Sequence, residues 1–310
     1  MSEDVQSTGI ADTPLRDQLA KGNAAIADAR PVLRHLLTNR DQEMFCDEVR
    51  ARVYGMLLHL ARQLLLLAVK SPPETAEERT QGLVQLLAED PAFLAHAHAL
   101  ALEARLAEDL RHRTGFDTVV SPLIQKLSAS NDPHKAGMAM RVLAAQARFL
   151  QQQRRMELPL GELPTELLDK ALLLMRSHVD ENGDTQAADA VLLEDISDQD
   201  SRLSLLEELV RSMDRDMIQA LAVDQAGLAI FLTALSIGAG IDRTLAVYSC
   251  GDDQSIRLAV TLRATGLEAR QIRGQILYLH PDVEVPEGID EISPATANAM
   301  LAEPATELVG

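Results

Sequence analysis

Apolar residues recur every three or four positions along most of the chain, which is the period of a helix with one buried face. Residues 41–69 show the pattern most clearly, and Asp41 is a candidate N-cap for this helix. Their apolar positions are Phe45, Val49, Val53, Leu57, Leu60 and Leu64. No segment alternates convincingly at period 2, as a half-buried strand would. The pattern therefore predicts an all-α chain.

Several predicted helices begin at a Thr-Pro or Asp-Pro pair, which supplies an N-cap side chain and a proline at the first helical position. These pairs are Thr13-Pro14, Asp90-Pro91 and Asp132-Pro133, and the helices are expected over 13–30, 92–113 and 132–156. Further helices are predicted at 74–89, 118–129, 165–178, 185–195, 201–213, 216–222, 225–237, 242–249, 253–265 and 269–279.

The clearest interruption of the helical pattern is the segment 158–164, which contains two prolines and a glycine. It predicts a boundary between an N-terminal helical unit, 13–157, and a C-terminal helical-repeat unit, 158–281. Residues 1–12 are expected to be disordered. Residues 282–310 are expected to form an acidic tail in which a short helix at about 294–301 folds back.

Two helical segments of the C-terminal part are similar to each other. Leu228–Ala234 and Leu258–Ala264 share four identical residues and one conservative match at a spacing of 30 residues. Each is followed by a glycine-containing turn and a second predicted helix. This pattern favours helical hairpins stacked as an irregular bundle or a short α-solenoid.

The same region carries a resemblance to a known family. The strings 227–241 and 258–267 resemble the C-terminal part of the alphaproteobacterial family of unknown function numbered 2336, and the stretch 147–160 is also similar to its members. The resemblance extends over about 123–279. It implies a helical scaffold with HEAT-like repeats, and it transfers no catalytic residue.

The charge of the chain is concentrated in two places. The net charge is -18. Residues 161–225 hold 16 acidic against 5 basic residues, and residues 282–310 hold 7 acidic residues and no basic one. The rest of the chain holds 24 of each sign. Localised acidity suggests docking, whereas direct nucleic-acid binding is disfavoured because it depends on basic residues that neutralise phosphates.

Targeting and cysteine signals favour a cytoplasmic protein. The acidic, polar first residues are unlike a signal peptide, and the longest nearly apolar stretch, 226–241, falls short of the roughly 20 residues needed to span a bilayer. The distant Cys46 and Cys250 predict two buried thiols rather than a disulfide framework.

Motifs for catalysis, cofactor binding and metal binding are absent from the sequence. His96 and His98 diverge by about 200° on a helix and cannot share a metal from one face. No phosphate-binding glycine loop, nucleophile elbow or zinc-protease motif occurs. We therefore predict no catalytic residue, no cofactor and no metal ligand.

Two polar sets are candidate partner-binding residues. Arg141, Arg148, Gln152 and Arg155 follow one helical face at i, i+7, i+11 and i+14, with Arg154 beside them. This stripe is either a solvated face that pairs with the acidic segment 161–225, or a docking face for an acidic peptide or a partner helix. The second set is Glu207, Glu208, Asp214 and Asp216, which is either solvated or docks a basic partner.

These observations favour a non-enzymatic, cytoplasmic helical-repeat protein that binds a protein partner as an adaptor or regulator. The alternative is a helical ligand-binding protein or enzyme with a buried pocket that no motif reveals. A third hypothesis is a homodimer through the 41–69 helix, because the run Leu64–Leu67 offers more apolar surface than one partner face requires.

Overall fold

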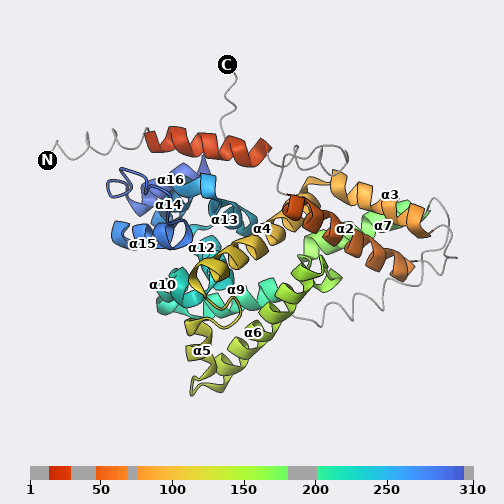
Figure 1. Cartoon of the computed structure of the whole chain (residues 1–310), viewed down its shortest axis with the longest axis horizontal. Coiled ribbons are helices and arrows are strands. Elements are labelled where there is room, and N and C mark those ends of the chain that lie inside the picture. Colours follow the sequence, from red (N-terminus) through yellow and green to blue (C-terminus); the bar gives the residue numbers. More distant parts are fainter. Residues whose placement is uncertain (1–13, 29–46, 69–75, 181–200, 304–310) are drawn as a thin grey trace. The chain divides into compact units, whose positions relative to one another are not determined.

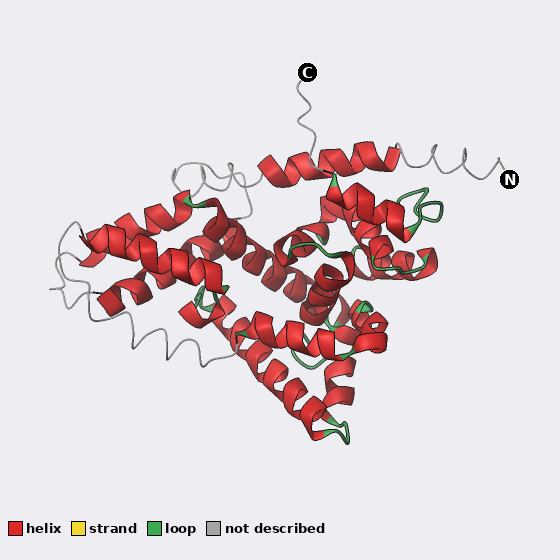
Figure 2. Ribbon diagram, turned by 180° about the vertical axis from the view of Figure 1, so that it is seen from behind, coloured by secondary structure: helices red, strands yellow, loops and turns green. Residues whose placement is uncertain are grey.

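The computed structural model describes residues 14–28, 47–68, 76–180 and 201–303 (Figure 1). Within these ranges every regular element is a helix and no strand occurs (Figure 2). The predicted all-α fold class is therefore confirmed. The predictions for residues 1–12, for the first residues of the 41–69 helix and for the 185–195 helix lie outside the described residues.

The chain forms two compact units, each built from separated pieces of sequence. Unit 1 contains residues 1–29, 106–140 and 206–310, and unit 2 contains residues 30–105 and 141–205. The chain passes from one unit to the other within the helices α4 (Pro91–Thr114), α6 (Pro133–Arg154) and α9 (Arg202–Ser212).

The division differs from the predicted boundary at residue 158. The segment 158–163 belongs to unit 2, where Leu158, Leu160 and Leu163 are buried. Two side chains of α2 (Asp47–Ala68) hold this segment: Gln63 Nε2 donates to the Leu158 carbonyl at 2.8 Å, and the Leu158 N–H donates to His59 Nδ1 at 3.2 Å. The proline-containing segment follows the end of α6 at Arg154 and does not end the unit.

In unit 2, α2 packs against α3 (Ala76–Glu89) and α7 (Thr165–Asp180), which also pack against each other. The apolar stripe predicted for α2 is confirmed from Val49 to Leu64, and these positions form part of one buried core. Each fully buried leucine contributes about 1.5–3 kcal/mol by removal from water. Gly55 permits a close approach inside this unit, because a Cβ there would lie 2.5 Å from Met156 Cβ.

The leucine run at the end of α2 is mostly used by unit 2 itself. Leu64 is fully buried, and Leu65 and Leu67 pack against the core. Leu66 is 80% exposed. Homodimer formation through this helix stays a prediction. Within the run Leu64–Leu67, Leu66 offers most of the apolar surface that a second copy could contact.

Unit 1 contains a helix at 14–28 and a series of short helices. They are α5 (Pro122–Ser128), α10 (Met217–Ala220), α11 (Val223–Ala226), α12 (Leu228–Ala239), α13 (Arg243–Ser249), α14 (Ser255–Ala264), α15 (Ala269–Leu279) and α16 (Pro294–Ala302). The two similar segments lie in α12 and α14, which pack against each other and are buried on nearly all sides. Each is followed by a helix that packs on it, α13 or α15.

No single described helix is long and apolar enough to cross a membrane. The pair α12 and α13 passes that test together by length and composition, but the two helices are bent by 113°. Most of their residues are buried inside unit 1.

Two predicted helices of unit 1 have different bounds in the structure. The helix predicted to start at Thr118 begins at Pro122, because the Asp117 carboxylate accepts the N–H groups of Val119 and Val120 and holds a turn before it. The helix predicted over 225–237 is broken at Gly227. That glycine has φ +78°, and a Cβ there would lie 3.2 Å from Ser121 Cβ, so a side chain is disfavoured.

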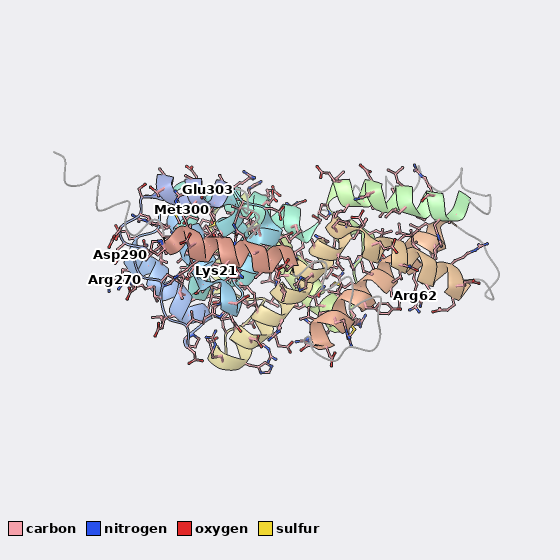
Figure 3. All side chains as sticks on the ribbon, turned by 90° about the horizontal axis from the view of Figure 1, so that it is seen from above. Lys21, Arg62, Arg270, Asp290, Met300 and Glu303 are labelled. Atoms are coloured by element: carbon pink, nitrogen blue, oxygen red, sulfur yellow. The ribbon has the colours of Figure 1, made fainter. Side chains whose placement is uncertain are left out.

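The predicted acidic tail is not a separate region. Residues 282–303 fold onto unit 1, where Ile289, Ile292 and Met300 are buried and α16 packs on α14. The short helix predicted at about 294–301 is confirmed by α16. Figure 3 shows Met300 and Glu303 beside the 14–28 helix, and Arg16 of that helix forms an ion pair with Glu303.

Candidate partner-binding groove

The helix α6 positions the predicted arginine stripe. In unit 2 its buried face consists of Val142, Ala145, Gln146, Phe149 and Gln153, which recur at helical spacing. Burial of that face turns Arg141 and Arg148 outward, and both are exposed. The orientation of the stripe therefore follows from the packing of the opposite face.

A groove of about 540 Å³ lies along the exposed face of α6 within unit 2. It is lined by Arg141, Ala144, Arg148, Gln152, Pro159, Gly161, Glu162 and Leu205. The helix α6 contributes the basic and amide groups, the turn η2 (Leu160–Glu162) with the preceding proline contributes the second wall, and α9 contributes an apolar side chain. This volume lies in the range of about 300–1,000 Å³ that is common for ligand sites.

Three of the four predicted stripe residues line this groove, and Arg155 does not. The helix α6 ends at Arg154, and Met156 has φ +57°, so the chain turns away at this point. Arg154 and Arg155 are exposed but are not among the groove-lining residues. The periodicity that places Arg155 on the stripe applies only while the helix continues.

Glu162 is the acidic side chain that lines the groove. Its carboxylate accepts the N–H of Arg202 at 3.1 Å, and it is attracted by the charges of Arg202 and Arg148. Desolvation by burial is the largest influence and raises its pKa, the two arginines lower it, and Glu103 raises it. The net effect is a pKa above the usual value of a glutamate.

The groove is supported by a buried ion pair. Arg202 and Glu103 are each 1% exposed, and Nη1 and Nη2 of Arg202 donate to the two carboxylate oxygens of Glu103 at 2.8 and 3.1 Å. Nη1 also donates to Gln146 Oε1 at 3.1 Å, and the guanidinium lies 3.6 Å above the centroid of the Phe149 ring. Forked hydrogen bonds and ring stacking are the geometry that arginine favours. Through these contacts, Arg202 at the start of α9 packs against Glu103 of α4 and against Gln146 and Phe149 of α6. They also position Leu205, which follows on α9.

Sequence reasoning missed Glu162, Arg202 and Glu103. One signal was available: Glu103 stands among Leu100, Ala104 and Ala107, where the helical period predicts buried positions. A charge at such a position requires a partner. The sequence does not identify that partner, because Arg202 lies 99 residues away.

The predicted acidic set lies in unit 1 and is exposed. Glu207 pairs with Arg211 at 3.8 Å, and Asp216 accepts a hydrogen bond from Gln219 at 3.0 Å, so both contact neighbours on their own segment. Glu208 and Asp214 are exposed as well. A docking role for this set stays a prediction.

Burial shifts the pKa of two further titratable side chains. Burial raises the pKa of the Cys250 thiol to about 12 and lowers the pKa of His98 to about 4. In a second cavity, of about 370 Å³ in unit 1, His280 contacts Asp252 through Nδ1 at 2.9 Å and the Cys250 carbonyl through Nε2 at 2.9 Å. Both ring nitrogens are thus occupied. Across the ranges that the structure describes, no group of three or more His, Cys, Asp or Glu could hold a metal ion, and Cys46 lies outside those ranges.

Comparison with known proteins returned no match, either to a family model, to a curated protein or to a solved structure.

Proposed function

We propose that this protein is a non-enzymatic helical scaffold that acts as an adaptor or regulator by binding a protein partner in the groove along α6. The observation that carries the proposal is the groove itself. It gathers two exposed guanidinium groups, an amide and a buried leucine around one open volume of about 540 Å³.

The composition of the groove favours binding over catalysis. Arg141 and Arg148 cannot act as proton acceptors at neutral pH, and their forked donors suit carboxylates. Glu162, the one titratable acid in the lining, has both neighbouring arginine charges and a backbone N–H directed at it. These contacts hold the Glu162 side chain in the wall of the groove, while burial raises its pKa.

The HEAT-like architecture implied by the family resemblance is part of this proposal. It is supported by the two successive helix pairs of unit 1, α12 with α13 and α14 with α15. Stacked helix pairs provide extended surfaces that bind protein segments.

A ligand-binding function is the second candidate, and the convergence of Arg148, Gln152 and Glu162 favours it. A small anion bound there would stabilise the folded chain by an amount that increases with the concentration of the anion. A melting temperature that rises with a small dicarboxylate in the wild-type chain, and not in an Arg141→Glu/Arg148→Glu chain, would support this candidate.

The test of protein binding is affinity purification from the native cells with three chains: wild type, Arg141→Glu/Arg148→Glu and Arg155→Glu. Arg155 is the matched control, because it is an exposed arginine next to the end of α6 and outside the groove. We expect proteins that are recovered with the wild type and the control, and lost with the double variant. Equal recovery by all three chains would contradict the proposal.

A further inference from the structure

We propose that the groove binds an extended acidic segment of the partner, in which two carboxylates stand three residues apart. This inference rests on the proposed function and names the chemistry of its partner. It is carried by the spacing of Arg141 and Arg148 and by the other groups that line the groove.

The two arginines define a distance that a partner must match. They are seven residues apart on one helix, so they lie on nearly the same face and about 10 Å apart along the axis. A segment in the polyproline II conformation rises about 3.1 Å per residue with three residues per turn. Residues i and i+3 of such a segment therefore lie on one side, about 9 Å apart, and can each meet one guanidinium.

A helical segment is the alternative occupant of this open groove. Two helical turns would also place two carboxylates about 10 Å apart, but those carboxylates would be seven residues apart in the sequence. The extended segment places them three residues apart. Peptides whose carboxylates are three residues apart therefore distinguish the extended segment from the helix.

The remaining lining groups suit the backbone of an extended segment. Gln152 stands one helical turn beyond Arg148 and lines the same groove, and its amide can both donate to a carbonyl and accept from an N–H. An extended backbone in this conformation has its N–H and C=O groups available, because it forms no internal hydrogen bonds. Leu205 provides an apolar contact for a side chain between the two carboxylates.

Glu162 makes the inference testable by a gain of binding. Its carboxylate repels an incoming acidic segment and attracts Arg148. Glu162→Gln removes that charge and keeps an oxygen that can accept the Arg202 N–H, so the wall of the groove is preserved. We expect this variant to bind the acidic segment about fivefold more tightly, as the removal of one nearby like charge implies. A misfolded variant would not show that gain.

The experiment measures fluorescence anisotropy with three acetylated and amidated peptides and the full chain. The probe contains Glu-Pro-Leu-Glu, a neutral control contains Gln-Pro-Leu-Gln, and a spacing control contains Glu-Glu-Pro-Leu. We expect the probe to bind, the neutral control to lose binding, and the spacing control to bind at least fivefold more weakly because it reaches one arginine. Equal binding of all three peptides would overturn the inference.

Substitutions in the chain complete the test. Arg148→Ala should weaken the probe by about tenfold or more, the value of a lost charge-assisted hydrogen bond, and Arg155→Ala should leave its affinity unchanged. Equal weakening by both variants would mean that general charge attraction, and not the groove, binds the probe. The probe could fail to bind while the Arg141→Glu/Arg148→Glu chain still loses a native partner in the purification. That combination would overturn the proposal of an extended acidic segment, and the proposed function would stand.

The chain itself supplies a competing occupant. Residues 181–200 contain seven acidic residues and no basic one. In a variant with a neutral Gly-Ser linker of equal length at 181–200, we expect the probe to bind as it does to the wild type. Binding to this variant alone would assign the groove to the chain's own segment and would overturn the partner proposal.

Discussion

Unit 2 uses arginine in two opposite ways on the two faces of α6. On the buried face, Arg202 is 1% exposed and contacts Glu103, Gln146 and Phe149. On the exposed face, Arg148 borders an open groove. The buried guanidinium donates to Glu103 and Gln146, so it organises the fold. The exposed arginine can exchange water for a partner, so it can serve binding. Burial, and not residue type, separates the two roles.

The largest expected effect comes from breaking the buried pair. Glu103→Ala leaves the guanidinium of Arg202 buried without its carboxylate, and we expect the free energy of unfolding to fall by about 3–5 kcal/mol. Urea denaturation monitored by circular dichroism measures the change. A loss below about 1 kcal/mol would mean that solvent reaches Arg202 and that the two faces of α6 do not differ as described.

Replacing both charges should have a smaller effect than replacing one. Glu103→Leu/Arg202→Met removes the pair without leaving a buried charge, a change that is often neutral or favourable in proteins. Here it also deprives buried Gln146 of its donor, so we expect a net loss of about 1–2 kcal/mol. The same denaturation experiment, analysed as a double-mutant cycle, tests this. A double variant as unstable as Glu103→Ala would contradict the explanation based on an unpaired charge.

Glu162 lines the groove and also accepts the backbone N–H of Arg202. It should make the free energy of unfolding depend on pH. Its raised pKa means that the folded chain binds its proton more readily than the unfolded chain. Its stabilising contribution is therefore complete below the ordinary glutamate pKa and is lost as the pH rises through the raised value. We expect the stability of the wild type relative to Glu162→Gln to fall over that window. A flat difference across the window would contradict the burial of this carboxyl.

The smallest effect is expected on the exposed face. Arg148→Ala should change the free energy of unfolding by less than about 0.5 kcal/mol, as most surface substitutions do, and Arg155→Ala should behave in the same way. Denaturation of the two variants side by side measures this. A loss above about 2 kcal/mol for Arg148→Ala would show that this arginine supports the fold and is not reserved for binding.

Local patterns were sufficient to predict much of this molecule. The stripe from Val49 to Leu64 and the Asp-Pro starts of α4 and α6 appear in the structure as the sequence indicates. These features depend on residues a few positions apart. The late start of α5 was missed, because it depends on the Asp117 side chain that accepts from the nearby backbone. The break at Gly227 was missed, because the helical period does not show that this glycine adopts a positive φ.

The groove was predicted in part. Helical periodicity brought Arg141, Arg148 and Gln152 onto one face, and the structure places all three in the groove. The same periodicity included Arg155, because it could not show where the helix ends. The opposite wall, with Glu162, comes from a proline-containing segment that was expected to separate two units.

The sequence by itself determined the helical class, the amphipathic faces and the presence of an arginine stripe, because each is a property of residues close together in the chain. Only the tertiary structure decided that the chain folds into two discontinuous units and that Glu103 forms its ion pair with Arg202. It also decided that residues 282–303 pack on unit 1. These outcomes depend on which buried surfaces meet between segments that are far apart in the sequence. A charge or an apolar face at a buried position of the sequence pattern shows only that it requires some partner.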